Sequence, residues 1–227
     1  MDFQSDQLQE RISLVTTSDG SQTLAVDGGL EHYHSTNGAI EEAMHVYIGA
    51  GLAKVVGPKV AVFEMGFGTG LNAMLAYIYA VNNGVEVRYL TLERYPLSSN
   101  ITLKLSYPSI LGVDRQKFFD SLHSASWNEW HQLDPLFFFK KVEYNMENYA
   151  LSDSVDVVFY DAFSPDLQPN LWSVDVFKNI YSALSVGGSL VTYSSKGFVK
   201  NNLREAGFIV KRLPGPKGKR HMVLAQK

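Results

Sequence analysis

Short apolar runs alternate along the chain with segments of helical period, and this alternation predicts the fold. Each run ends in an acid or in turn residues, as buried strands do. Strands are expected at residues 60–64, 85–92, 137–144, 155–160, 189–193, 208–213 and 221–225. Helices are expected between them at about 70–82, 173–184 and 197–206. This repetition indicates an α/β fold with a seven-stranded, mostly parallel sheet and helices on both faces.

The two ends of the chain depart from this repetition. Residues 208–213 and 221–225 lie close enough to form a hairpin, so one of them should run antiparallel to the other strands. Residues 11–28 alternate on both sides of a turn and predict a second hairpin. We therefore expect residues 1–38 to form an N-terminal hairpin and loop appendage, and residues 39–227 to form the main domain.

Further helical segments are predicted outside the strand–helix repeat. A helix is expected at about 39–52, and 96–104 resembles a helix start. Residues 114–131 are expected to be helical insert material, and Gly187-Gly188 should stop the helix that begins near residue 173. The buried face of the helix at 39–52 is expected to carry Ile40, Ala43, Met44 and Tyr47.

Composition indicates a soluble globular protein. The 227 residues are 45% apolar and 19% charged, and no apolar run is long enough to predict a membrane span. There is no cysteine, which excludes disulfides and thiolate zinc sites, and the six His show no metal-binding spacing, so no metal is expected. The polar, acidic N-terminus argues against a signal peptide and favours a cytoplasmic location. The net charge of −3 argues against indiscriminate nucleic-acid binding but leaves room for a local basic patch.

A glycine-rich turn follows the strand at 60–64. Gly66, Gly68 and Gly70 stand at alternate positions before an apolar helical segment, and Glu64 precedes them. Such a turn brings backbone N–H groups close to a ligand. The spacing is not the G-x-G-x-x-G of dinucleotide sites, and a carboxylate at Glu64 would repel a pyrophosphate. It suits a cationic ligand such as S-adenosylmethionine, the alternative being a plain strand–turn–helix corner.

Two more acids stand at predicted strand ends, where open parallel sheets bind ligands. Glu93 lies 23 residues past Gly70, about where a ribose-binding acid occurs, although it could simply pair with Arg94. Asp161 ends the strand at 155–160 and could orient an amine and accept its proton, or could be a turn or capping residue. After it, Phe163 and Pro165 offer an apolar wall for a planar base, or are ordinary turn and core residues.

Six motifs along the chain form a distinctive series. They are Tyr33-His34-Ser35, Phe67-Gly68-Thr69-Gly70-Leu71-Asn72, Tyr160-Asp161-Ala162-Phe163-Ser164-Pro165, Asn170-Leu171-Trp172, Gly187-Gly188-Ser189-Leu190-Val191-Thr192-Tyr193 and Pro214-Gly215-Pro216-Lys217-Gly218-Lys219-Arg220-His221-Met222. Together they resemble the methyltransferase of the MnmC family of tRNA wobble-uridine modification. The resemblance covers about residues 12–225.

This resemblance implies a class I, Rossmann-like fold using S-adenosylmethionine. It implies methylation of the exocyclic amine of 5-aminomethyl-2-thiouridine at the wobble position, in the tRNA anticodon loop. In the bifunctional relatives a flavin-dependent oxidase domain makes that amine. The chain resembles the stand-alone methyltransferase version, so flavin is not expected and a separate enzyme should supply the precursor amine.

Site residues are carried over position by position. Asp161 matches the family's aspartate, the catalytic or amine-orienting residue. The cofactor would be bound by Glu64, Gly66, Phe67, Gly68, Gly70, Asn72, Glu93, Asn145, Met146 and Asp161. One departure concerns the adenine end, where the family often has Gly-Asp and this chain has Tyr144-Asn145. Asn145 could still accept a hydrogen bond from the adenine amino group, and Met146 could pack on the ring or belong to the core.

The tRNA would be contacted through a basic cluster and an aromatic loop. The cluster comprises Lys211, Arg212, Lys217, Lys219 and Arg220, with Lys196 and Lys200 as extensions. It is interpreted as a phosphate patch, the alternative being a solvated hairpin tip. Tyr33 and His34 could close over the cofactor or stack on the base, or belong to an ordinary surface loop.

Three other functions are compatible with parts of this pattern. A small-molecule or protein N-methyltransferase would use the same sheet and glycine turn. A non-catalytic nucleotide-binding module is disfavoured by Asp161 beside the glycine turn. An NAD-dependent enzyme is disfavoured by Glu64 and by the glycine spacing.

Overall fold

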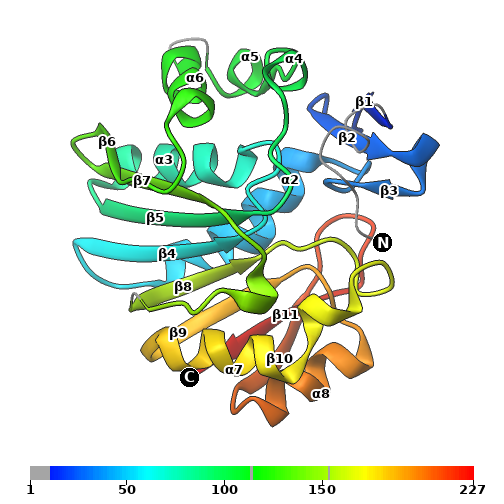
Figure 1. Cartoon of the computed structure of the whole chain (residues 1–227), viewed down its shortest axis with the longest axis vertical. Coiled ribbons are helices and arrows are strands. Elements are labelled where there is room, and N and C mark those ends of the chain that lie inside the picture. Colours follow the sequence, from blue (N-terminus) through cyan, green and yellow to red (C-terminus); the bar gives the residue numbers. More distant parts are fainter. Residues whose placement is uncertain (1–10, 113–114, 153) are drawn as a thin grey trace.

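A computed structural model describes residues 11–112, 115–152 and 154–227 of the chain. Their main feature is a twisted eight-stranded sheet with the order β10-β11-β9-β8-β4-β5-β7-β6 (Figure 1). The strands are β4 (Lys59–Met65), β5 (Glu86–Glu93), β6 (His131–Asp134), β7 (Phe137–Glu143), β8 (Val155–Tyr160), β9 (Leu184–Thr192), β10 (Ile209–Pro214) and β11 (His221–Gln226).

The strand directions confirm the predicted mostly parallel sheet. The five strands β7, β5, β4, β8 and β9 are parallel neighbours. β11 runs antiparallel to both β9 and β10, as predicted for the C-terminal hairpin. Acids at the ends of β4, β5 and β8 therefore come to one edge of the sheet.

One strand more is present than the seven predicted. β6 pairs antiparallel with β7 at the edge of the sheet. The segment 114–131 was expected to be helical throughout, but its helix ends at Ser124. A tight turn at Pro135 and Leu136 follows β6, and the Asp134 carboxylate accepts the Leu136 N–H there at 2.9 Å. This side-chain-supported turn lets residues 131–134 fold back on β7.

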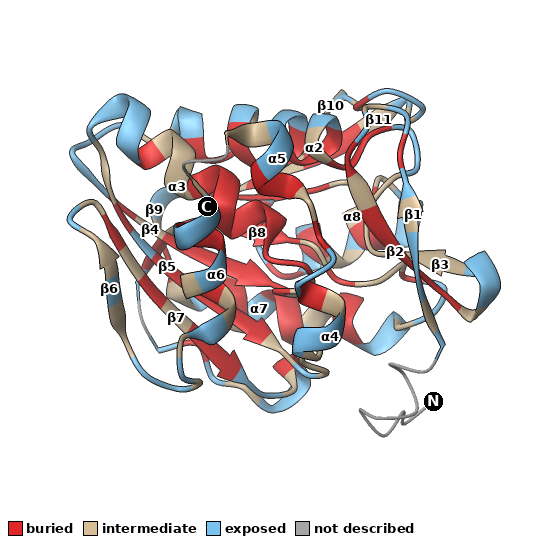
Figure 2. Cartoon of the chain, turned by 90° about the horizontal axis from the view of Figure 1, so that it is seen from above, coloured by how far each residue is buried: buried red, intermediate tan, exposed pale blue. Residues whose placement is uncertain are grey.

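Helices cover both faces of the sheet and bury a separate core on each (Figure 2). α3 and α6 lie on one face with the N-terminal helical segment, and α7 and α8 lie on the other. The helices are α2 (Ala39–Ala43), η2 (Met44–Gly49), α3 (Leu71–Asn83), α4 (Ser99–Thr102), α5 (Tyr107–Leu111), α6 (Gln116–Ser124), α7 (Val174–Ala183) and α8 (Gly197–Glu205). Short 3₁₀ turns are η1 (Asp27–Gly29), η3 (Leu52–Lys54), η5 (Met146–Asn148) and η6 (Pro169–Trp172).

The predicted helix at 39–52 is real but irregular. After α2 the chain widens into the π-helical turn η2, in which the Ala50 N–H donates to the carbonyl of His45, five residues earlier. The buried face differs from the predicted one at one position. Tyr47 is buried as predicted, whereas Met44, predicted to be in the core, is 44% exposed.

The glycine pair at 187–188 does not stop a helix. α7 already ends at Ala183, and both glycines lie inside β9. A Cβ at Gly188 would lie 2.9 Å from the Asp156 carbonyl oxygen, so a side chain there would press on β8. The strand pairing slips at this point, between Val155 and Val157. The pair therefore forms a bulge, which glycine favours.

The N-terminal hairpin is confirmed and carries a third short strand. β1 (Ile12–Thr16), β2 (Gln22–Val26) and β3 (Glu31–His32) form a small antiparallel sheet, which lies beside α4 and α5 in Figure 1. The Tyr107 hydroxyl donates to the Gln22 carbonyl at 2.8 Å and anchors the sheet there. Residues 1–10 of the predicted appendage lie outside the described residues, and the domain boundary at residue 38 stays a prediction.

Across these described segments, no helix combines the length and apolar character that a membrane crossing requires.

A substitution at Gly51 tests how tightly the helical segment formed by α2 and η2 packs on the sheet. A Cβ there would lie 2.5 Å from the Tyr47 carbonyl oxygen and 2.9 Å from a Val191 methyl group. Gly51→Ala should lower the free energy of unfolding by about 1–3 kcal/mol, measured by urea denaturation. Gly197→Ala is the control, because a Cβ there meets open space. Equal stability of the two variants would contradict this packing.

Candidate active site

The glycine turn is pressed against the end of β8. Gly66 has φ 92°, and a Cβ on it would lie 3.0 Å from the Asp161 carbonyl oxygen. Its N–H donates to the Leu92 carbonyl at 3.0 Å. Only glycine fits such a left-handed, crowded position without strain. The turn thus links the ends of three neighbouring strands, β5, β4 and β8.

Glu93, at the end of β5, is hydrogen-bonded to this turn. Its carboxylate accepts the Gly68 N–H at 2.9 Å and the Tyr95 N–H at 2.8 Å. Burial raises the pKa of Glu93, and these backbone donors oppose the rise. The backbone N–H of Arg94 also donates to Glu93. A carboxylate has about four acceptor positions, so these three donors leave room for a further hydrogen bond from a hydroxyl.

Glu64 is a buried acid, with 1% of its surface exposed. Neither carboxyl oxygen has a hydrogen-bond partner among the described residues, although Thr91, Asn72 and Tyr89 lie nearest. Burial raises the pKa of Glu64 well above its usual range. An unpartnered buried carboxyl is costly to the fold, so the position favours an external cationic or hydrogen-bonding ligand.

Asp161 follows β8 and is held by two side chains from different helices. The Tyr47 hydroxyl donates to Oδ1 at 2.5 Å, and the Asn72 amide donates to Oδ2 at 2.8 Å. Burial raises the pKa of Asp161 to about 6, while these two hydrogen bonds act in the opposite direction. Asp161 can therefore exchange a proton near neutral pH, as a general base must.

Aromatic side chains stand beside this acid. Tyr33, from the loop after β3, packs edge-on against Phe163 with ring centroids 5.0 Å apart. A Cβ at Gly68 would lie 3.1 Å from the Tyr33 ring, so this ring also covers the glycine turn. Burial raises the pKa of Tyr33, and the nearby Glu93 charge adds to the rise. The structure thus brings Tyr33 and Phe163 together, with Pro165 buried just beyond them.

The contacts of His34 are those of a residue that stabilises the fold. Its Nδ1 lies 3.2 Å from the Thr23 hydroxyl, and its backbone N–H donates to the same hydroxyl at 2.9 Å. Burial lowers the pKa of His34 to about 4, so the ring is neutral at pH 7. These contacts hold the loop that carries Tyr33 and His34 against β2.

Asn145 and Met146 follow β7, at the predicted adenine end. The Asn145 side chain accepts the Glu147 N–H at 3.2 Å and caps η5. Met146 is 1% exposed and packs in the core on the α7 face. Both contacts are those of structural residues, and an additional role toward a ligand stays a prediction.

The predicted basic cluster divides into inward and outward side chains. Lys219 Nζ lies 2.5 Å from the buried Glu42 carboxylate and 4.2 Å from the centre of the Tyr193 ring. Glu42 also accepts the Ser35 N–H at 2.9 Å. Lys219 thus joins the turn 214–220 to α2 and to the aromatic loop. The outward side chains, Lys217, Arg220, Lys211 and Arg212, are exposed, and Lys196 pairs with Asp166.

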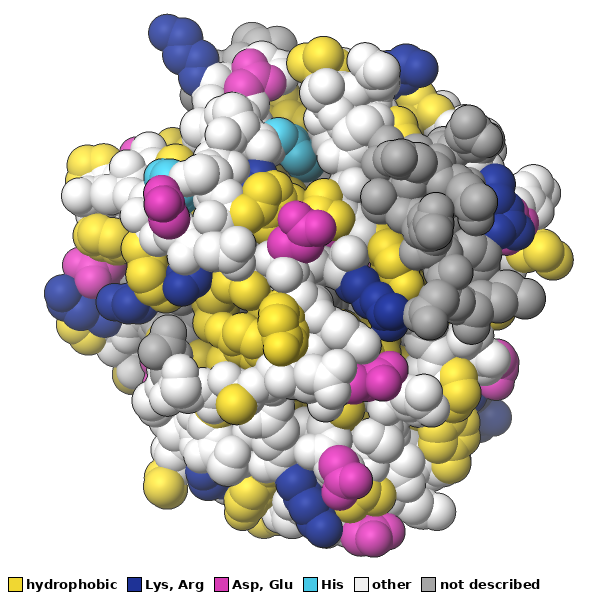
Figure 3. Space-filling view, in the orientation of Figure 1, with side chains coloured by type: hydrophobic (Ala, Val, Ile, Leu, Met, Phe, Trp, Pro, Cys, Tyr) yellow, Lys and Arg dark blue, Asp and Glu magenta, His cyan; other side chains and the backbone are white. Residues whose placement is uncertain are grey.

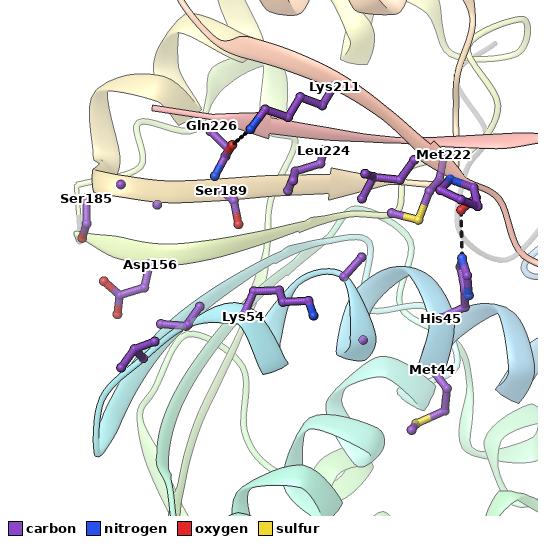
Figure 4. Close-up of a pocket in the computed structure, with 18 of the residues that line it drawn as sticks. Met44, His45, Lys54, Asp156, Ser185, Ser189, Lys211, Met222, Leu224 and Gln226 are labelled. Atoms are coloured by element: carbon purple, nitrogen blue, oxygen red, sulfur yellow. Dashed lines mark hydrogen bonds between the residues drawn. The ribbon is translucent and has the colours of Figure 1, made fainter.

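Two hollows flank the molecule. A cavity of about 310 Å³ lies between the glycine turn, α4 and α6, and its lining includes Phe67, Gly68 and Lys141. A groove of about 1240 Å³ lies between η2 and the strands β9, β10 and β11 (Figure 4). At one end of the groove His45 is hydrogen-bonded to the Pro214 carbonyl, at 2.9 Å. None of the predicted cofactor residues lines this groove.

Two residues near the site were not predicted as functional. Tyr47 was assigned only to a buried helix face, and no sequence signal shows that its hydroxyl reaches Asp161. Lys141 is 2% exposed, and its ammonium donates to the carbonyls of Leu122 and His123, at the end of α6. Burial lowers the pKa of Lys141 to about 8. Among the described residues no cluster of three or more His, Asp or Glu could hold a metal ion.

Comparison with known proteins shows what the chain is similar to. Residues 134–227 match the model of a family described as S-adenosyl-L-methionine-dependent methyltransferase. The crystal structure of spermidine synthase from Thermotoga maritima shares the fold, with TM-score 0.58, 17% identity and coverage of 94% of this chain and 68% of that one. The chain therefore has the class I, Rossmann-like fold, and its residues 134–227 are similar to an S-adenosyl-L-methionine-dependent methyltransferase family.

Within that class the chain is similar to MnmC, which confirms the predicted resemblance. The bifunctional MnmC protein of Marinomonas sp. (strain MWYL1), named for tRNA 5-methylaminomethyl-2-thiouridine biosynthesis, is 27% identical over 210 residues, covering 86% of this chain and 31% of that protein. The structure of MNMC2 from Aquifex aeolicus matches with TM-score 0.75 and 25% identity, over 95% of this chain and 69% of that one. The chain spans about a third of the length of the curated MnmC relatives it matches.

Removing the Lys219 ammonium tests the inward half of the basic cluster. Lys219→Met leaves the Glu42 carboxylate, whose side chain is 8% exposed, without its cation. The free energy of unfolding should fall by roughly 1–3 kcal/mol, measured by urea denaturation. The double variant Glu42→Gln/Lys219→Met should recover part of the loss.

The matched control is Lys217→Met, which removes an exposed lysine two residues away. Its stability should stay within about 0.5 kcal/mol of the parent chain. If Lys219→Met were as stable as this control, the ion pair would not fasten the turn to α2.

Proposed function

We propose that this protein methylates the exocyclic amine of 5-aminomethyl-2-thiouridine at the wobble position of tRNA, giving 5-methylaminomethyl-2-thiouridine. The observation that carries the proposal is the half-buried carboxylate of Asp161, held beside the glycine turn by Tyr47 and Asn72. The similarity to MnmC supplies the substrate. A different enzyme activity would have to supply the aminomethyl group of that substrate.

The residues around the glycine turn suit S-adenosylmethionine. The unpartnered Glu64 carboxyl matches a ligand that brings an ammonium group, and the acceptor capacity that Glu93 retains matches a ribose hydroxyl. Gly66, Phe67, Gly68 and Gly70 would line the methionine half. Asn145 and Met146 remain the expected contacts of the adenine. When bound, the cofactor supplies an electrophilic methyl group.

Asp161 would prepare the acceptor amine. An ammonium has no lone pair to attack a methyl group, so the nitrogen must be neutral and correctly aimed. With a pKa of about 6, the Asp161 carboxylate is ionised at pH 7 and can take a proton from the amine. Tyr33 and Phe163 would flank the base, since an extruded nucleobase stacks on aromatic side chains.

The tRNA would be held by outward-facing cations of the C-terminal hairpin. Lys217 and Arg220 are exposed on the turn whose Lys219 is fastened beside the site. Phosphates of the anticodon loop would meet these side chains while the wobble base is splayed out. Figure 3 shows other Lys and Arg side chains dispersed over one face, several beside acids, as expected from the net charge of −3. Binding should therefore be modest and salt-sensitive.

Labelled methyl transfer tests the substrate. With S-adenosylmethionine carrying a labelled methyl group, tRNA bearing 5-aminomethyl-2-thiouridine should be labelled, and the same tRNA bearing 2-thiouridine should not. The labelled nucleoside should be the methylaminomethyl form. Equal labelling of both tRNAs, or labelling of neither, would show that the substrate is wrong. Methyl transfer to free small amines that resists high salt would favour a small-molecule methyltransferase.

Replacing the acid tests its role. Asp161→Ala should lower the rate of methyl transfer roughly 100-fold or more, with little change in S-adenosylmethionine affinity measured by calorimetry. In the parent chain the rate should fall as the pH drops through about 6, because protonated Asp161 cannot accept a proton. Loss of cofactor binding in Asp161→Ala would instead assign Asp161 to the cofactor site.

A further inference from the structure

We propose that Tyr47 is a positioning residue, which together with Asn72 aims the Asp161 carboxylate at the acceptor amine. This inference rests on the proposed function, and it adds a residue that the sequence motifs do not single out. Tyr47 would touch neither the methyl donor nor the base. It would act through Asp161 alone.

Two donors fix the plane of the carboxylate. Tyr47 donates to one oxygen at 2.5 Å, and Asn72 donates to the other at 2.8 Å. A carboxylate with one donor on each oxygen cannot rotate without breaking a hydrogen bond, and each oxygen keeps a lone pair for the amine. Hydrogen bonds to a charged group are also among the stronger ones in proteins. Asp161 is thereby held in one orientation before any substrate arrives.

The rigidity of Tyr47 comes from its surroundings. Its side chain is 2% exposed, and its ring lies 5.4 Å from that of Phe159 on β8. The close approach of the Tyr47 carbonyl to Gly51 seats this helical segment on the sheet. A ring enclosed in this way has no alternative rotamer, so its hydroxyl is delivered to one point.

Tyr47 lies within the π-helical turn η2. Ala39, Ala43, Val46 and Tyr47 are buried at α-helical spacing, which points the Tyr47 side chain at the sheet and leaves Met44 exposed. The widened turn follows, where the Ala50 N–H donates to the His45 carbonyl. Such turns are frequent at functional sites.

Several charged or titratable groups face Asp161 besides its two donors. They are Glu42 on α2, Lys219 on the C-terminal turn, Glu64 on β4, Tyr89 on β5 and Tyr193 on β9. Of these, Lys219 favours the carboxylate and Glu42 disfavours it. The hydrogen bond from Tyr47 also lowers the pKa of Asp161, so removing it should raise that pKa.

Two substitutions of opposite effect test the proposal. Tyr47→Phe removes the donor, and 3-fluorotyrosine placed at position 47 in the full chain is a more acidic, stronger donor. The Asp161 titration is followed by NMR of ¹³Cγ-labelled aspartate, assigned with Asp161→Asn. The Asp161 pKa should rise in Tyr47→Phe and fall with fluorotyrosine. The kcat of Tyr47→Phe should fall roughly tenfold, its acid limb moving to higher pH, with KM and cofactor affinity nearly unchanged.

Tyr160→Phe is the matched control. Tyr160 is fully buried beside Asp161 in sequence, but its hydroxyl donates to the Leu171 carbonyl. This variant should leave the Asp161 titration unmoved. An unchanged titration in both Tyr47 variants, or an equal shift in Tyr160→Phe, would overturn the inference. The NMR titration needs neither cofactor nor tRNA, so its outcome is separate from a failure of the parent chain to methylate tRNA.

Discussion

The parallel pairing of β4 with β8 is the interaction on which the site depends. The register sets Met65 opposite Tyr160, and the Asp161 N–H continues it by donating to the Met65 carbonyl at 3.1 Å. Gly66 and Asp161 then lie at adjacent strand ends, in backbone contact that only a glycine allows. A slip of one residue in this ladder would put Glu64 and Asp161 on opposite faces of the sheet, because side chains alternate along a strand.

Burial sets the chemistry of the site more than any single ion pair does. Glu64 is buried, Glu93 and Asp161 are half-buried, and burial is the main cause that raises the pKa of each. Hydrogen-bond donors oppose this rise at Glu93 and Asp161, whereas neither Glu64 oxygen has a hydrogen-bond partner among the described residues. Loss of water thus acts on all three acids in one direction, and the donors around each acid set how far its pKa rises.

Features that depend on local order or on strand direction could be predicted from the sequence. The glycine turn and the acids Glu64, Glu93 and Asp161 meet because the carboxyl ends of parallel strands share an edge. Features that depend on helix phase or on distant partners could not. The π-helical turn that contains Tyr47 has no periodic signature, and Glu42 and Lys219 are 177 positions apart. The bulge at Gly187-Gly188 has the same composition as a helix stop, and only the packing against β8 distinguishes them.

The contact between the loop at Asn37 and the C-terminal turn at Gly218 has a consequence for the order in which the site forms during synthesis. Asn37, in the N-terminal loop, lies so close to Gly218 that a Cβ there would be 2.2 Å from its amide nitrogen. A ribosome completes the glycine turn, Asp161 and the aromatic loop well before it reaches Lys219. A growing chain can therefore assemble the parallel strands first. The turn 214–220, which Lys219 holds against α2, can pack beside the site only after those strands have been made. The order of translation thus separates formation of the sheet from formation of the enclosed site.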